Sequence, residues 1–357
     1  MIGATVIKLI QQAKYMKMAM KRYKNFLLPG RYWLYDSLRA ICLEDPQFQE
    51  KAKNYFHPMS DYSPRKAQIA KLLNKIHYFC NHLRAPHGQY QAIYVANNYD
   101  KIRETKLFSF TQNKILIICT CAQDMNRQLQ DYAMFGDAYK MPKIRQYDEL
   151  KNALEVSMID RREFPGDAVA LSAIAEATVA YNSHPTSSLL YKPVKEYIAF
   201  FYEDERIQSL MMELADGLND DILNDQLPLC MQHGDLSKDN LIYGECDQEK
   251  AFWWIDWEHA GERIFFYDYF FYILNSMRYG DPGAYTCYIN GGNDDVLKTY
   301  FSHFGLVFDP DKRWDYFMVY TICFLKERVC DKGYSHALER YCSLIKNAAE
   351  GNDGTNQ

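Results

Sequence analysis

The spacing of apolar and polar residues changes along this chain, and its middle part predicts β-strands. Between residues 91 and 160, short stretches rich in Ile, Val, Leu, Tyr and Phe are separated by turn-forming residues, which is typical of strands. The predicted strands are residues 92–95, 102–110, 115–120, 143–147 and 153–159, and residues 124–135 have the spacing of a helix. This segment therefore predicts a small sheet with at least one helix.

The second half of the chain has mainly helical spacing. Residues 168–181 are rich in Ala, and residues 197–218 place apolar and acidic side chains at helical intervals. An aromatic-rich helix is predicted to begin within residues 264–272, and residues 309–349 predict two further helices. The remaining residues, 350–357, are predicted to be a disordered tail.

The first 27 residues combine an apolar stripe with a block of positive charge. The stripe recurs at steps of three and four residues and consists of Ile2, Val6, Leu9, Ala13, Met16, Met20, Tyr23 and Leu27. Seven Lys and Arg residues precede the first acidic residue, Asp36. Such a helix can lie on an anionic membrane surface, or its apolar stripe can pack on the neighbouring sheet. Residues 1–88 as a whole are predicted to be a helical N-terminal extension.

Composition excludes several classes of protein. Lys and Arg number 41 against 46 Asp and Glu, a formal net charge of −5, so nucleic acid is not predicted as a partner. The ten cysteines include no C-x-x-C pair, which favours reduced thiols in a cytoplasmic protein over a zinc site. Lysines interrupt the first apolar run, and the later run at 264–274 is too short to span a bilayer, so neither a signal peptide nor a membrane helix is predicted.

Two short motifs point to phosphoryl transfer. The first is His233-Gly234-Asp235, with Asn240 five residues after the aspartate; the second is Ile255-Asp256-Trp257-Glu258, which follows the apolar stretch at 251–254. An aspartate in a loop can accept the proton of a substrate hydroxyl, while an asparagine and a second aspartate supply oxygen ligands for magnesium. One such motif alone is often only a polar turn. Two motifs in this order favour a phosphotransferase centre.

These motifs resemble those of the aminoglycoside phosphotransferase and choline kinase family. The resemblance is tight over residues 230–275 and loose elsewhere. It implies an α+β, two-lobed, protein-kinase-like fold, with a small, mostly antiparallel β N-lobe at residues 89–158 and a larger, mainly helical C-lobe at 159–349. It also implies Asp235 as the catalytic base and Asn240 and Asp256 as ligands of Mg²⁺. His233 and Asp268 would support the catalytic loop.

The resemblance implies an ATP site that the sequence supports less completely. A kinase-type lobe holds the nucleotide phosphates with a strand lysine that pairs with a helix glutamate. Residues 115–120 contain no lysine and residues 124–135 no glutamate, so Lys106 is the first candidate and Lys114 the second. Each also fits a plain surface lysine. The hinge that binds adenine would include Glu155, Met158 and Ile159.

The phosphate acceptor is the least specified feature. Trp257, Glu258, Phe265 and Tyr267 could line its pocket, as a cage for a quaternary ammonium or a platform for a sugar ring, or could instead fill the core. We expect an ATP-dependent kinase that phosphorylates a hydroxyl of a sugar or amino-alcohol in envelope polysaccharide biosynthesis, a cytoplasmic protein with peripheral contact at the inner membrane face through residues 1–27. The alternatives are a choline or ethanolamine kinase, an aminoglycoside phosphotransferase and an inactive nucleotide-binding pseudokinase.

Overall fold

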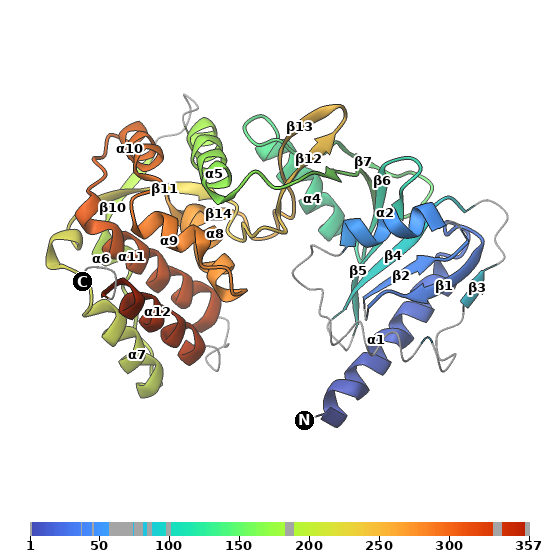
Figure 1. Ribbon diagram of the computed structural model, residues 1–357, viewed down its shortest axis with the longest axis horizontal. Helices are drawn as coiled ribbons and strands as arrows, with labels where there is room; N and C mark the ends of the chain where they lie inside the picture. Colours follow the sequence, from blue (N-terminus) through green and yellow to red (C-terminus); the bar gives the residue numbers. More distant parts are fainter. Residues whose placement is uncertain are drawn as a thin grey trace. The chain divides into compact units, whose positions relative to one another are not determined.

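The computed structural model describes residues 2–36, 38–44, 46–56, 74, 81–83, 88–97, 101–182, 189–330 and 338–353. The chain divides into two compact units. The first comprises Met1–Phe164 and Leu241–Glu258, and the second comprises Pro165–Asn240 and His259–Gln357. Each unit has its own sheet and helices (Figure 1), and each is described separately below.

The first unit is built on an eight-stranded antiparallel sheet in the order β3-β1-β2-β4-β5-β6-β8-β7. Its strands are β1 (Gly30–Leu34), β2 (Arg39–Cys42), β3 (Asn81–Leu83), β4 (Ala92–Asn97), β5 (Ile102–Ser109), β6 (Lys114–Cys119), β7 (Ile144–Gln146) and β8 (Ala153–Ser157). The helices are α1 (Ile2–Arg22), α2 (Pro46–Phe56) and α4 (Ala122–Phe135). A smaller sheet contains β9 (Asp160–Arg161), β12 (Leu241–Cys246) and β13 (Glu249–Trp254). The five strands and the helix predicted between residues 92 and 159 are confirmed.

Both faces of the large sheet are covered, because side chains on a strand alternate between faces. Ile93 and Leu107 point toward α1, where they pack with Met16 and Met20. Their neighbours Ala92 and Phe108 point the other way, toward Phe56 of α2. Farther along that second face, Ile117 and Cys119 pack on Met125 and Leu129 of α4. The sheet therefore carries α1 on one face and α2 and α4 on the other.

The first 88 residues are not a separate helical extension, which corrects that prediction. Strands β1 and β2 lie inside the large sheet, and β3 is its edge strand. These strands have five, four and three residues, which is too short for alternation to be recognised in the sequence. Residues 57–73, 75–80 and 84–87 lie outside the described residues.

The apolar stripe of α1 belongs to the core of the first unit from residue 13 onward. Ala13, Met16, Met20, Tyr23 and Leu27 are all buried against the sheet. This is the packing alternative named above for the stripe; the side chains of residues 2–9 lie outside the described residues. Among the described residues, no helix combines the length and the apolar character needed to cross a membrane.

The second unit is mainly helical. Its helices are α5 (Asp167–Asn182), α6 (Val194–Tyr197), α7 (Glu205–Ala215), α8 (Tyr267–Arg278), α9 (Gly283–Ile289), α10 (Asp294–His303), α11 (Arg313–Leu325) and α12 (Leu338–Asp353), with two short 3₁₀ turns, η1 (Asp220–Ile222) and η2 (Pro310–Lys312), and a π-helical turn, η3 (Lys326–Cys330). Three antiparallel strands, β10 (Leu190–Pro193), β11 (Gln226–Gln232) and β14 (Gly261–Ile264), form its sheet. This confirms the predicted α+β class, with a mostly antiparallel β part and a mainly helical part.

Some element boundaries differ from the predictions. Helix α7 begins only at Glu205, because the Asp204 side chain accepts hydrogen bonds from the N–H groups of Arg206 and Ile207 and so caps it there. Helix α12 continues to Asp353, so residues 350–353 of the predicted tail are helical, and residues 354–357 lie outside the described residues. The hairpin of β12 and β13 groups with the first unit, because β12 pairs with β9.

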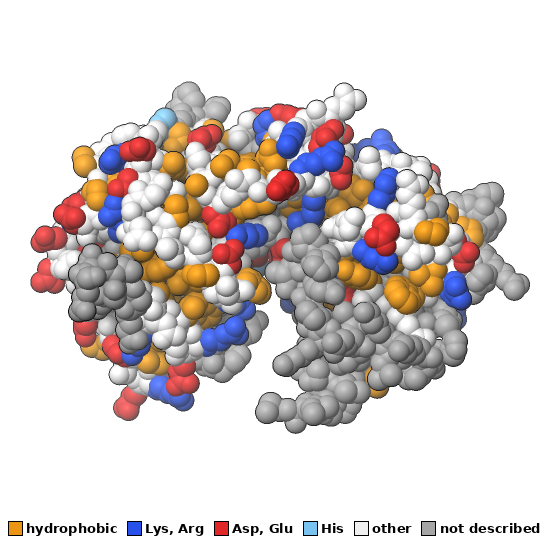
Figure 2. Space-filling model, viewed as in Figure 1, with side chains coloured by type: hydrophobic (Ala, Val, Ile, Leu, Met, Phe, Trp, Pro, Cys, Tyr) orange, Lys and Arg blue, Asp and Glu red, His pale blue; other side chains and the backbone are white. Residues whose placement is uncertain are grey.

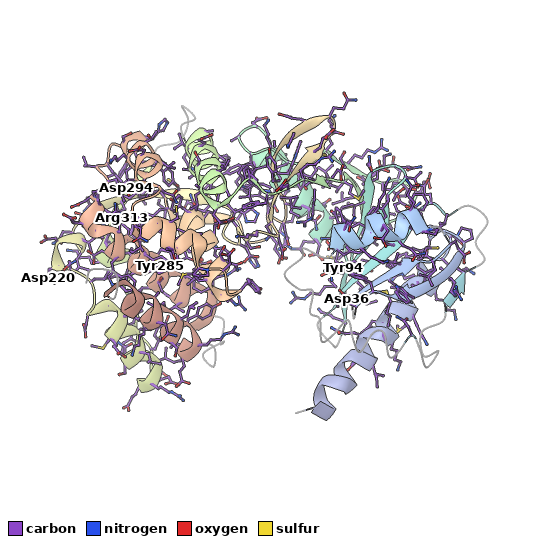
Figure 3. The ribbon with its side chains drawn as sticks, viewed as in Figure 1. Asp36, Tyr94, Asp220, Tyr285, Asp294 and Arg313 are labelled. Atoms are coloured by element: carbon purple, nitrogen blue, oxygen red, sulfur yellow. The ribbon has the colours of Figure 1, made fainter. Side chains whose placement is uncertain are left out.

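The core of the second unit is aromatic. Every residue of α8 from Tyr267 to Leu274 is buried, and Phe270 contacts Tyr288, Phe317 and Tyr320 from two other helices. At the rim of this core, Asp294 of α10 and Arg313 of α11 form an ion pair (both are labelled in Figure 3). On the face shown in Figure 2, Lys and Arg side chains lie among Asp and Glu side chains rather than in one large basic patch.

Candidate active site

The loop from His233 to Asn240 follows strand β11 in the second unit and is held from below by Asp268. The Asp268 carboxylate is 1% exposed. It accepts the backbone N–H of His233 at 2.6 Å and that of Gly234 at 2.8 Å. In return, the Asp268 N–H donates to the side chain of Gln232 at 3.0 Å. The loop thus begins from a buried anchor, which is the supporting role predicted for Asp268.

Burial affects the protonation of this anchor. Loss of solvent raises the pKa of Asp268 to about 6, although the N–H donors of Gly234 and His233 and the Arg263 guanidinium act to lower it. The neighbouring Asp235 carboxylate raises it further. The ionised form is therefore maintained at neutral pH by hydrogen bonds, against the cost of burial.

Gly234 fits the loop because no other residue can occupy its position without strain. Its φ is +80°, in the left-handed region, and a Cβ placed there would lie 2.4 Å from the His259 carbonyl oxygen and 2.6 Å from Arg263 Nη1. Gly234 stands where the protein-kinase motif has an arginine. In this chain the guanidinium of Arg263 occupies the space that a side chain on Gly234 would fill, and it is paired with Glu327.

Asn240 folds back on Asp235 and closes the loop. Its Nδ2 donates to the Asp235 backbone oxygen at 2.8 Å and lies 3.4 Å from Asp235 Oδ2. The amide is therefore oriented by its donor end, which leaves Oδ1 as the end suited to a cation. Magnesium prefers oxygen ligands of this kind, so the geometry of Asn240 fits the predicted metal role.

Arg328 holds the other oxygen of the candidate base, a contact that no sequence pattern indicated. Arg328 Nη2 donates to Asp235 Oδ1 at 2.7 Å, and the Arg328 side chain is 12% exposed. The two residues are 93 positions apart in the chain. No local motif joins them, so sequence reasoning had no means of finding this pair.

Lys238, also inside the loop, is an anchor rather than a free cation. Its Nζ lies 2.9 Å from Asp167 Oδ1 at the start of α5 and 2.8 Å from Asp281 Oδ2. Its burial lowers the pKa of the Lys238 ammonium, but the two carboxylates outweigh that effect and raise it. Lys238 thus gives the loop a second attachment within the second unit, in addition to the one at His233 and Gly234.

In the first unit, Lys106 pairs with the Glu104 carboxylate. Its Nζ is 3.0 Å from Glu104 Oε1 and the side chain is 29% exposed. Burial alone would lower the pKa of Lys106, but the Glu104 and Asp256 carboxylates raise it above the usual value. Of these two carboxylates, Glu104 is the ion-pair partner of Lys106, and the phosphate-binding role of Lys106 stays a prediction.

Glu104 is the partner that the sequence analysis missed. It is two residues before Lys106 on β5, and residues two apart share a strand face, so strand periodicity could have found it. Gln128 of α4 donates to Glu104 at 3.4 Å. The acidic partner of Lys106 thus comes from its own strand, while helix α4 contributes the Gln128 amide.

The Lys106 ammonium lies over the aromatic ring of Tyr94. The two residues face each other across β4 and β5, and Lys106 Nζ lies 6.0 Å from the ring centroid (Tyr94 and Asp36 are labelled in Figure 3). Arg39 lies over the same ring at 5.2 Å, but it is buried and paired with Asp36. Lys106 is thus the partly exposed cation of this group.

Asp256 has an unusual backbone conformation. It follows β13 by two residues, is exposed, and has a φ of +67°. Only a few per cent of non-glycine residues have positive φ, and such positions cluster at functional sites. An exposed carboxylate in this conformation fits the predicted metal role of Asp256, which stays a prediction.

The other predicted nucleotide residues have protein partners. Glu155 is 8% exposed, and its Oε1 lies 2.8 Å from Arg145 Nε and 3.0 Å from Lys114 Nζ. Lys114 is therefore an ion-pair partner of a carboxylate on strand β8. The Met158 N–H donates to the Asn113 carbonyl at 2.8 Å. Ile159 is buried in a small cluster with Ile242 and Trp253. The adenine-binding hinge at Glu155, Met158 and Ile159 stays a prediction.

The predicted acceptor aromatics mostly fill cores. Trp257 is 3% exposed and stacks on Phe135 with ring centroids 4.1 Å apart. Phe265 is fully buried and contacts Tyr300 and three phenylalanines. Tyr267 is buried beneath the Arg263 guanidinium, and Glu258 is exposed. Of the alternatives given above for these rings, core packing is what their contacts show.

Comparison with known proteins gives likenesses at the level of structure. No protein-family model matches the chain, and no curated protein matches it. Similar solved structures include a choline/ethanolamine kinase family protein from Mesorhizobium loti (TM-score 0.41, 14% identity, 72% of this chain and 87% of that chain). They also include choline kinase from Streptococcus pneumoniae (0.39, 14%, 81% and 100%) and the GDP complex of an aminoglycoside 2′-phosphotransferase mutant (0.43, 12%, 87% and 99%).

All three are small-molecule kinases by name. They represent both groups of enzyme whose motifs this chain resembles.

Proposed function

We propose that this chain is an ATP-dependent kinase that transfers the γ-phosphate of ATP to a hydroxyl group of a small molecule. The observation that carries the proposal is the loop from His233 to Asn240. Its backbone is fixed by the buried Asp268, and the Asn240 amide and the Arg328 guanidinium converge on Asp235. A carboxylate held in this way is suited to orient a hydroxyl and accept its proton.

The first unit supplies the groups suited to the nucleotide. Lys106 would bind phosphate oxygens, with Glu104 keeping it charged, and Asp256 would provide an oxygen ligand for Mg²⁺. Asn240, in the second unit, is the other residue predicted as a Mg²⁺ ligand. When bound, the metal neutralises charge on the transferred phosphoryl group. The remaining work is positioning, because phosphoryl transfer needs little covalent help from the protein.

The acceptor within this proposal is a sugar or an amino-alcohol. An acceptor destined for envelope polysaccharide was suggested by the basic helix α1, and that hint is weakened because the apolar face of α1 from residue 13 onward is buried on the sheet. An inactive pseudokinase is the rival in another class. Purified protein, Mg-ATP and pooled alcohols, followed by mass spectrometry of the products, separate the two. An alcohol heavier by one phosphate supports the proposal, and ATP binding without any product supports the pseudokinase.

A further inference from the structure

Helix α2 covers the face of the large sheet on which Lys106 lies. Lys106 and Phe108 are two residues apart on β5, so their side chains point to the same face. Their cross-strand neighbours on β4 are Tyr94 and Ala92. Phe56 of α2 packs on Phe108 with ring centroids 5.0 Å apart, and α2 lies over this face of the sheet (Figure 1). The apolar surface next to Lys106 along its own strand is therefore covered by α2.

This surface has the character that an adenine ring requires. Small-molecule sites are lined mainly by apolar and aromatic side chains with a few polar groups at fixed places, and a flat ring stacks well on aromatic neighbours. We call the surface the apolar shelf; its buried side chains are Ile41, Ala92, Phe108, Phe110 and Met158. Met158 is one of the residues predicted to bind adenine, and Lys106 is the residue predicted to bind the phosphates. The structure thus places α2 on the surface where the predicted nucleotide would lie.

The last turn of α2 fills the space over the shelf with two aromatic rings. Phe56 is fully buried, and the Tyr55 ring centroid lies 5.7 Å from that of Phe108 and 6.0 Å from that of Phe110. The Arg161 guanidinium lies over the Tyr55 ring at 5.6 Å. Nε and Nη2 of Arg161 are buried without a hydrogen-bond partner among the described residues, which is a cost to this arrangement. Packing on the shelf therefore holds α2 in place while two buried donors stay unpaired beside it.

We propose that α2 is an autoinhibitory lid: Tyr55 and Phe56 occupy the place of the adenine ring, and ATP binds when α2 leaves the apolar shelf. The inference rests on the proposed kinase function and adds a control of its nucleotide site. Helix α2 has 11 residues, and an isolated helix of that length is marginal in water, so its packing maintains it. Segments of this kind can open without unfolding of the whole unit. The apparent Mg-ATP affinity is then the intrinsic affinity multiplied by the fraction of molecules in which α2 is off the shelf.

The first arm of the test weakens the lid and leaves Lys106 in place. We expect Phe56→Ala to increase the Mg-ATP affinity, measured by calorimetry, by roughly 10- to 100-fold, because only the covered state loses packing. Tyr55→Ala, at a partly buried position, should act in the same direction by a smaller factor. Met20→Ala removes packing from the opposite face of the same sheet and should bind Mg-ATP as the wild type does.

Magnesium tripolyphosphate separates the shelf from the phosphate site. It has the phosphates of ATP without the adenine ring, and Lys106 is 29% exposed with α2 in place. Its affinity should therefore be the same in the wild type, Tyr55→Ala and Phe56→Ala. A rise for tripolyphosphate equal to the rise for Mg-ATP would mean general loosening rather than an uncovered shelf, and would overturn the inference.

The second arm uses only the wild type, so it does not depend on the folding of a variant. Saturating Mg-ATP should speed backbone hydrogen exchange in residues 46–56, measured by mass spectrometry, because bound ATP keeps α2 off the shelf. Unchanged or slower exchange there when ATP binds, or equal Mg-ATP affinity in the wild type and both lid variants, overturns the inference and leaves the kinase function standing. Absence of Mg-ATP binding in the wild type and in both lid variants overturns both.

Discussion

Replacing Asp268 by Asn should change the pH dependence of stability in a direction set by its buried position. The folded protein holds this carboxyl with a pKa of about 6, against 3.8 for the free group. A raised pKa means that the folded state binds the proton more tightly than the unfolded chain. The carboxyl therefore contributes stability that is fully present below about pH 4 and is lost as pH rises through about 6.

The size of the effect follows from the same shift. A difference of about two pKa units corresponds to about 3 kcal/mol, of which about 2 kcal/mol falls between pH 4 and pH 6. Asp268→Asn cannot titrate, so the difference in unfolding free energy between wild type and variant should move by this amount, with the wild type losing relative stability as pH rises. Urea unfolding followed by circular dichroism at several pH values measures the difference.

The same variant should also lose turnover. The amide introduced by Asp268→Asn has a single oxygen to accept the two N–H groups, and its own NH₂ group would face one of those donors, so the start of the catalytic loop shifts. We expect roughly a 10- to 100-fold lower kcat at neutral pH, as for a misplaced catalytic group. Asp315→Asn, which alters another buried carboxylate that binds Asn219, should leave kcat near normal. A pH-independent stability difference would refute the burial argument, and normal turnover in Asp268→Asn would refute the positioning argument.

Three further changes test other parts of the structure. Gly234→Ala should lose turnover because its Cβ would meet the His259 carbonyl, whereas Gly305→Ala, with φ of +69° but open space around it, should cost only a modest stability of roughly 1 kcal/mol. Lys106→Met should weaken Mg-ATP binding by roughly 10- to 100-fold in calorimetry, and Lys114→Met should not. Met20→Ala should lower the unfolding free energy by about 2–5 kcal/mol, while Met18→Ala, 55% exposed, should be nearly silent in the same denaturation assay.

The sequence predicted those parts of the fold that local pattern determines. Strands β4 to β6 are long enough to show alternation, and the loop from His233 to Asn240 carries its chemistry within eight residues. Strands β1 to β3 were missed because pairing within the sheet, rather than their own sequence, makes them strands. Within α1, the predicted stripe is confirmed as one buried face at Ala13, Met16 and Met20, but whether a sheet or a membrane covers such a face is a tertiary property.

The candidate site was predicted where its residues are close in sequence and missed where they are not. Glu104 could have been predicted from strand periodicity, because residues two apart on a strand share a face and Glu104 is two residues before Lys106. Arg328 could not be predicted in this way, since its contact with Asp235 depends on how η3 packs against the loop. The aromatic residues 257, 265 and 267 show a different limit: a ligand cage and a hydrophobic core use the same side chains, and only burial distinguishes them.

The central claim is that Asp235 serves the transfer step while Asp256 serves Mg-ATP. Calorimetric titration with Mg-ATP, run beside a phosphate-transfer assay, tests it on wild type, Asp235→Asn and Asp256→Ala. We predict that Asp235→Asn binds Mg-ATP normally and transfers no phosphate, and that Asp256→Ala loses both binding and transfer. Near-normal turnover in Asp256→Ala with an unchanged circular dichroism spectrum, or equal loss of binding and transfer in Asp235→Asn, would contradict the account.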